Sequence, residues 1–118
     1  MKLVIYPPVD EIRCASIQAV SEIIVITNCP DEATAESEIS DASAFFGKLT
    51  PAILAAAKEL RWVQSPTASL EHFIFPELID HPCVLTNMRG IYSDVIADHV
   101  LGYCLLYTSD AADDTPCV

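Results

Sequence analysis

Glycine is scarce in this sequence of 118 residues, which contains only Gly47, Gly90 and Gly102. Nucleotide-binding loops of the G-x-G-x-x-G or G-x-x-x-x-G-K-[ST] type need two or three glycines within a few residues, because only glycine lets the backbone approach a phosphate closely. The three glycines lie far apart in the sequence. Both kinds of loop are therefore excluded from this chain.

Positive charge and long apolar runs are also lacking. Six Lys and Arg residues stand against 17 Asp and Glu residues, and the formal net charge is −11. Because affinity for polyanions comes mainly from Lys and Arg, we expect no binding to nucleic acid or to anionic membranes. No stretch approaches the ~18 consecutive apolar residues of a membrane span, and the run after Met1 is too short for a signal peptide. We therefore predict a cytoplasmic protein.

Cysteine spacing indicates neither a zinc site nor a disulfide framework. The five cysteines are widely separated, form no C-x-x-C pair and are odd in number: Cys14, Cys29, Cys83, Cys104 and Cys117. Metal sites and disulfide scaffolds are recognised by closely spaced or paired cysteines. We expect no metal, and reduced, mostly buried thiols.

Apolar residues, by contrast, make up 52% of the chain, enough for one sizeable core. Short runs rich in β-branched and aromatic residues alternate with helical patterns. The predicted strands are residues 3–6, 22–28, 44–47, 61–65 and 83–87. Such alternation predicts an α/β fold, with a parallel five-stranded sheet of flavodoxin-like order and helices on both faces.

The helical segments have recognisable starts. Asp10 opens the first, Thr50 and Pro51 cap and begin another at 51–60, and Ser93 caps the last, at 94–103. Residues 31–43 are acidic and are expected to form a solvated helix or loop. Residues 70–78 form a short helical piece around Pro76.

The loop after the fourth predicted strand, residues 64–69, is the most polar strand end. Its small side chains leave backbone N–H groups accessible, which suits a carboxylate or a phosphate. An ordinary strand-to-helix turn with Ser69 as cap explains the same residues. Arg89, in the next loop, is either an anion ligand or a surface arginine. We interpret the three histidines, His72, His81 and His99, as structural because no catalytic order or metal spacing accompanies them.

The end of the chain resembles translated sequencing adapter. The transposon end used in tagmentation libraries, read in one frame, encodes CLLYTSDAAD, which is the sequence from Cys104 to Asp113. We predict that residues 104–118 are a non-native tail and exclude them from the fold. Removing Asp110, Asp113 and Asp114 lowers the acidic residues from 17 to 14 and changes the formal charge from −11 to −8.

Three successive segments resemble the D-isomer-specific 2-hydroxyacid dehydrogenases: FFGKLTP at 45–51, LRWVQSPTASLEH at 60–72 and TNMRGIYSDVIADHV at 86–100. The resemblance covers nearly all of residues 1–103 and is to the amino-terminal part of that family. It implies a flavodoxin-like substrate domain at residues 1–92. Residues 93–103 would then start the interdomain helix that leads to a missing NAD-binding domain.

The resemblance also implies a function. Members transfer a hydride between NAD or NADP and a small 2-hydroxy or 2-keto acid, and are commonly homodimers when intact. Thr67, Ala68 and Ser69 occupy the place of the loop whose backbone amides hold the substrate carboxylate, with Ser69 in place of the usual glycine.

The resemblance places the rest of the machinery elsewhere. The family's cofactor-binding glycines and its catalytic Arg, Glu and His lie downstream of the interdomain helix. We therefore expect a truncated dehydrogenase with no catalytic residue in this chain, inactive alone and without firm cofactor binding. The alternative is a complete, stand-alone α/β module that binds a carboxylate or a protein.

Overall fold

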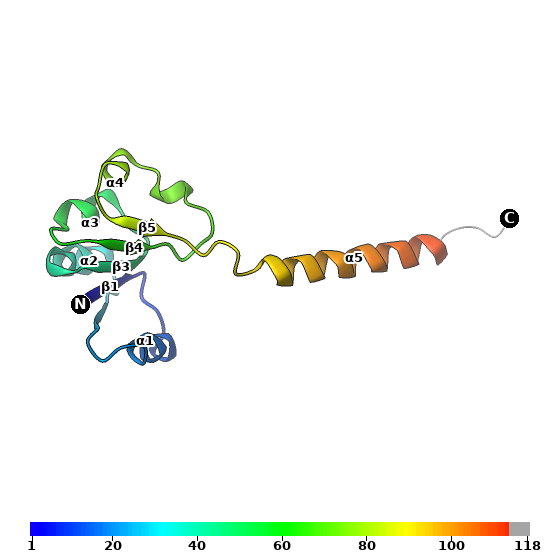
Figure 1. Ribbon diagram of the computed structural model, residues 1–118, viewed down its shortest axis with the longest axis horizontal. Coiled ribbons are helices and arrows are strands. Elements are labelled where there is room, and N and C mark those ends of the chain that lie inside the picture. The colour runs from blue at the N-terminus through cyan, green and yellow to red at the C-terminus, as the bar shows by residue number, and fades with distance from the viewer. Residues whose placement is uncertain (114–118) are drawn as a thin grey trace. The chain divides into compact units, whose positions relative to one another are not determined.

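The structure is a computed structural model that describes residues 1–113 (Figure 1). The chain divides into two units, of which the first spans Met1–Met88 and the second begins at Arg89. The first unit contains the sheet and is described first. The second, as far as the structure describes it, contains one helix.

Five parallel strands form a single sheet in the first unit. They are β1 (Lys2–Tyr6), β2 (Val25–Asn28), β3 (Ala44–Gly47), β4 (Trp62–Gln64) and β5 (Val84–Thr86). Their order across the sheet is β2-β1-β3-β4-β5, and every pairing is parallel. This is the flavodoxin-like order, so the predicted fold class is confirmed.

Helices cover the sheet unequally. They are α1 (Glu11–Gln18), α2 (Glu32–Glu38), α3 (Pro51–Ala56) and α4 (Pro76–Ile79), with short 3-10 turns η1 (Ile39–Asp41) and η2 (Glu71–Phe73). Figure 1 shows α1 on one side of the sheet and α3 and α4 on the other. Thr50 caps α3 as predicted, accepting a hydrogen bond from the Ile53 backbone N–H at 3.3 Å.

The main core lies on the face that α2, α3 and α4 cover. One row of residues that pair between neighbouring strands runs across this face. Val4 pairs with Phe45, Phe45 with Val63, and Val63 with Leu85 of β5. Val4, Phe45 and Val63 in that row are fully buried. Ala35 and Ile39 are also fully buried here, so residues 31–43 contribute to the core and are not merely solvated.

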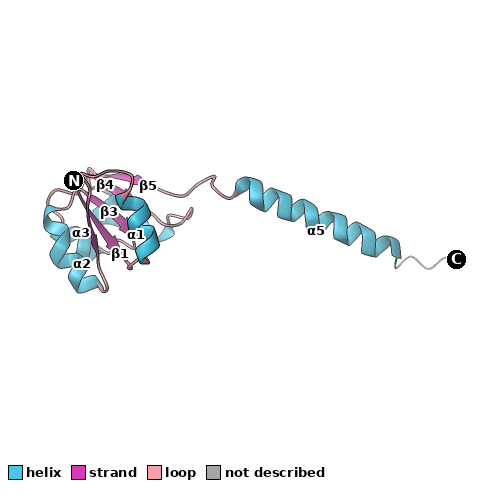
Figure 2. Cartoon of the chain, turned by 90° about the horizontal axis from the view of Figure 1, so that it is seen from below, coloured by secondary structure: helices cyan, strands magenta, loops and turns pink. Residues whose placement is uncertain are grey.

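The opposite face has a smaller core around Leu3, Ile5 and Ala44. Figure 2 views the sheet from this side, with α1 in front. The registers place Trp62 and Val84 in the same row as Ala44. Trp62 is 40% exposed and Val84 61% exposed, so this face is only partly covered.

Two predictions about burial are wrong, one for the second strand and one for the cysteines. The second strand was expected to span residues 22–28 and to be buried, but β2 begins at Val25, which is 62% exposed. The reason is position: β2 lies at the edge of the sheet and pairs only with β1. Similarly, only Cys29 of the described cysteines is fully buried, while Cys14 and Cys83 are partly exposed and Cys104 is exposed.

The helix of the second unit is α5 (Ser93–Asp113). The helix begins at Ser93, near the predicted start, and continues past residue 103 into the segment that we predicted to be adapter-derived. All of its described side chains through Thr108 are exposed, and the His99 ring packs edge-on against Tyr103 with centroids 4.7 Å apart. Residues 114–118, including Cys117, lie outside the described residues.

Gly47 holds the carboxyl ends of β1 and β3 together. It adopts φ +119°, and a Cβ atom at this position would collide with the Tyr6 carbonyl. The Lys48 backbone N–H donates to the same carbonyl oxygen at 2.7 Å. Only glycine fits this close approach.

We predict that Gly47→Ala lowers the free energy of unfolding by at least about 2 kcal/mol, because it combines positive φ with a backbone collision. Urea denaturation followed by tryptophan fluorescence of Trp62 measures this. Gly102→Ala is the matched control, since Gly102 lies in α5 with open space around it. Equal urea midpoints for wild type and Gly47→Ala would show that the approach is not required.

Candidate functional site

The candidate site is the loop between β4 and η2, at the carboxyl edge of the sheet. Ligands of open parallel α/β sheets bind at this edge. Ser65 opens the loop and is the only polar residue among those described that is fully buried. Its Oγ accepts from the Thr67 N–H at 3.2 Å and lies 3.1 Å from the Thr67 carbonyl oxygen, so it stabilises a tight turn.

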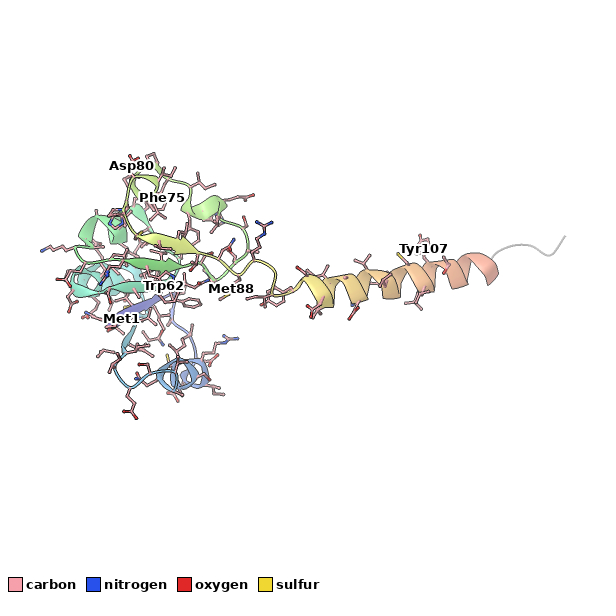
Figure 3. All side chains as sticks on the ribbon, in the orientation of Figure 1. Met1, Trp62, Phe75, Asp80, Met88 and Tyr107 are labelled. Carbon is pink, nitrogen blue, oxygen red and sulfur yellow. The ribbon has the colours of Figure 1, made fainter. Side chains whose placement is uncertain are left out.

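Every carbonyl of residues 67–69 is hydrogen-bonded within the protein. The Thr67 carbonyl also accepts from the Met88 backbone N–H at 3.2 Å. The Ala68 carbonyl accepts from the Asn87 side-chain Nδ2 at 2.7 Å, and the Ser69 carbonyl from the Thr67 hydroxyl at 2.8 Å. Figure 3 labels Met88, which follows β5 and thus marks the strand end that holds the loop. The carbonyl acceptors of residues 67–69 are therefore all used inside the protein.

The backbone N–H groups of this loop, unlike the carbonyls of residues 67–69, are not all hydrogen-bonded. No hydrogen bond within residues 1–113 engages the backbone N–H of Ala68 or of Ser69, and both residues are exposed. Thr67 has its N–H bonded to Ser65, and Pro66 has no N–H. Two successive amide donors are thus available beside each other, as in backbone sites that bind anions.

The structure brings together the three residues singled out from the sequence, but in different roles. Ala68 and Ser69 carry the available donors, whereas Thr67 is engaged in holding the turn. Ser69 also accepts a long hydrogen bond, 3.4 Å, from the Glu71 N–H through its Oγ. A capping role would use the Ser69 hydroxyl and an anion site would use its backbone N–H, so the two interpretations are compatible. That these residues bind substrate stays a prediction.

Sequence reasoning missed Asn87 and the role of Ser65. Asn87 follows β5 directly, so the signal was a polar residue at a strand's carboxyl end. Its contact with Ala68 joins residues 19 apart in the sequence. No local pattern reveals such a pairing.

Metal ligands are not clustered in the part of the chain that the structure describes. Within residues 1–113, no three His, Cys, Asp or Glu side chains come together in a way that could hold a metal ion. His81 accepts through Nδ1 from the Cys83 N–H at 3.2 Å, a structural contact. Arg89 belongs to the second unit. Burial raises the pKa of the Cys83 thiol, so this cysteine is a poor nucleophile.

A shallow apolar depression of about 310 Å³ lies between η2, α4 and β5. Figure 3 marks α4 by its flanking residues Phe75 and Asp80. The depression is lined by Leu70, Phe73, Ile74, Leu78, Ile79, His81, Cys83 and Leu85. Leu70 follows the two available amides, but apart from His81 and Cys83 the lining side chains are apolar.

The described residues do not fit a dinucleotide. A cofactor cradle needs glycines where phosphate replaces the missing Cβ. At Gly47 that space is filled by the Tyr6 carbonyl, and Gly90 and Gly102 are too far apart in the sequence to form one loop.

Comparison with known proteins gives structural neighbours only. No family model matches the sequence, and no curated protein matches it significantly. The phosphoglycerate dehydrogenase of Lactobacillus plantarum superposes with a TM-score of 0.61 at 19% identity, covering 89% of this chain and 34% of that one. The PH0520 protein of Pyrococcus horikoshii OT3 gives a TM-score of 0.63 at 15% identity, covering 86% and 31%.

The chain shares their fold. At these identities the likeness extends to the architecture alone, which agrees with the five-stranded parallel sheet. The chain spans about a third of the length of each neighbour. No helix among the described residues combines the length and the apolar character needed to cross a membrane.

We predict that Ser65→Ala destabilises the protein by about 1–2 kcal/mol, because the Ser65 side chain is fully buried and its hydroxyl bonds to both the N–H and the carbonyl of Thr67. Thermal unfolding measures the loss, and faster exchange of the Thr67 amide proton locates it. Ser37→Ala is the control, since the exposed Ser37 hydroxyl bonds only to the Thr34 carbonyl of its own helix. Equal effects of the two substitutions would contradict the assignment.

Proposed function

We propose that this chain is the substrate-binding part of an NAD- or NADP-dependent D-2-hydroxyacid dehydrogenase. The observation that carries the proposal is the pair of available amides, Ala68 and Ser69, at the carboxyl end of β4. The fold shared with a phosphoglycerate dehydrogenase supports it. The ligand of the chain itself is then a small 2-hydroxy or 2-keto acid, bound through its carboxylate.

The physical basis is short-range hydrogen bonding. Two successive N–H groups can bind the two oxygens of a carboxylate, and the carbonyls of residues 67–69 do not compete because each is already bonded. Hydrogen bonds to a charged group contribute about 1.5–3 kcal/mol each, while association costs about 4 kcal/mol or more. We therefore expect millimolar or weaker binding by this chain alone.

In the intact enzyme, NAD or NADP would supply the hydride acceptor or donor. The residues of this chain would bind and orient the acid. The Thr67 and Ser69 hydroxyls beside the two amides bond to backbone within the loop, which supports a role in binding rather than in proton transfer. We propose that the chain by itself has no dehydrogenase activity.

The proposal also covers the origin of residues 93–118 and the assembly of the intact enzyme. Residues 104–118 would be adapter-derived, residues 93–103 would begin the interdomain helix, and the intact enzyme would be a cytoplasmic homodimer. The exposed apolar side chains of the helix favour a packing partner in the intact enzyme: Val95, Ile96, Val100 and Leu101 are all at least 53% exposed.

Sequencing the gene through the Tyr103 codon tests whether the chain is part of a longer enzyme. A continuing frame that encodes G-x-G-x-x-G is expected, and a natural stop codon there would support the stand-alone module instead.

Titration of the 118-residue chain with D-lactate tests the binding site. We expect saturable changes in the amide resonances of Ala68 and Ser69 in nitrogen–proton correlation spectra, with smaller changes elsewhere. Lactamide, which has the same shape but no charge, is the control and should cause little change. The absence of saturable changes at these amides would contradict the proposal, and reduction of NAD by the chain with D-lactate would contradict the predicted inactivity.

A further inference from the structure

Two asparagines hold equivalent loops at the two edges of the sheet. Asn28, the last residue of β2, donates from Nδ2 to the Val9 carbonyl at 2.8 Å and accepts the Val9 N–H at 3.0 Å. Asn87, just after β5, donates from Nδ2 to the Ala68 carbonyl at 2.7 Å. Each side chain thus extends from an edge strand to the loop that follows the neighbouring strand. Only the Asn87 contact involves the candidate site.

Peptide geometry makes the Asn87 contact directional. The Ala68 carbonyl and the Ser69 N–H belong to one planar peptide unit, in which C=O and N–H point in opposite directions. A hydrogen bond that holds the carbonyl therefore also fixes where the Ser69 N–H points. In the same way, the Thr67 carbonyl, held by the Met88 N–H, fixes the Ala68 N–H.

Each available donor therefore has its own support. The Ala68 N–H is aimed by a backbone contact, which no side-chain substitution removes, and the Ser69 N–H is aimed by the Asn87 side chain. A carbonyl that accepts a hydrogen bond also polarises its own peptide unit, which strengthens the N–H as a donor. Asn87 thus affects both the direction and the strength of one of the two donors.

We propose that Asn87 is a positioning residue for the carboxylate of the substrate. By donating to the Ala68 carbonyl, it holds the Ala68–Ser69 peptide so that the Ser69 N–H binds one carboxylate oxygen beside the Ala68 N–H. The inference rests on the proposed function, because it assigns a role within that site.

The fold itself depends little on this contact. Ala68 and Ser69 are exposed, so water can replace Asn87 at the Ala68 carbonyl. Loss of the Asn87 side chain should consequently affect ligand binding more than stability. This difference separates a positioning role from a structural one.

The test uses Asn87→Ala and Asn87→Asp in the 118-residue chain, titrated with D-lactate. Asn87→Ala removes the donor, and we expect the dissociation constant to rise about 3- to 10-fold. Asn87→Asp keeps the shape but cannot donate and adds a negative charge, so we expect a larger rise. Asn28→Ala and Asn28→Asp are the matched controls, because they make the same changes at the other loop and should bind like wild type.

The amide spectrum supplies a second measurement. In Asn87→Ala, the ligand-induced change should shrink at Ser69 more than at Ala68, whose peptide is held by Met88. A purely structural role would reduce both equally. The urea midpoints of the Asn87 variants should remain close to that of wild type, because Asn87 makes a single contact with an exposed loop.

The possible failures are distinguishable. Binding by wild type together with unchanged affinity in Asn87→Ala would overturn the positioning role and leave the proposed function standing. Unfolding of Asn87→Ala would overturn it as well, because Asn87 would then be required by the fold. A wild-type chain that shows no saturable change would contradict the proposed function and, with it, the inference.

Discussion

Parallel pairing is the constraint on which the rest of this structure depends. Because all five strands run in the same direction, their carboxyl ends meet at one edge, and each loop that leaves that edge must turn away beside its neighbour. The tightest such point is between β1 and β3, where Gly47 passes against the Tyr6 carbonyl. A larger residue there would separate the two central strands. The positions of β4 and its loop follow from that pairing.

At the edges of the sheet, side-chain amides supply hydrogen bonds that strand pairing cannot supply. A loop beyond the last ladder hydrogen bond has carbonyls and N–H groups that need partners. Asn28 and Asn87 supply them from the two edge strands. At the first loop both a carbonyl and an N–H are satisfied, whereas at the second only the carbonyl is. That difference turns one edge loop into a closed turn and the other into a candidate anion site.

The features that could be predicted from the sequence are those that depend on residues adjacent in the chain. The five strand segments and the Thr50 cap follow from local composition. The alternation of strands and helices predicts a parallel sheet, and right-handed crossovers leave few strand orders, of which the flavodoxin-like order was preferred. Burial depends on which strand lies alongside, so the edge position of β2 and the exposure of Val25 could not be predicted locally. The core role of Ile39 was missed because acidic neighbours surround it. The loop at 67–69 was recognised by its small residues, but its support by Asn87 comes from a distant strand.

The acidic charge of the chain explains why orientation matters at this site. A chain with a formal charge of −11 repels anions at long range, although salt screens this repulsion beyond about 8–10 Å. Backbone amides carry no net charge and act only over hydrogen-bond distance, so they compensate only when aimed correctly. A lysine would attract a carboxylate from many directions, whereas a peptide N–H has a single direction. A site built from amides in an acidic protein therefore depends on the groups that fix the peptide planes, which makes the carbonyl contacts of residues 67 and 68 as important as the donors themselves.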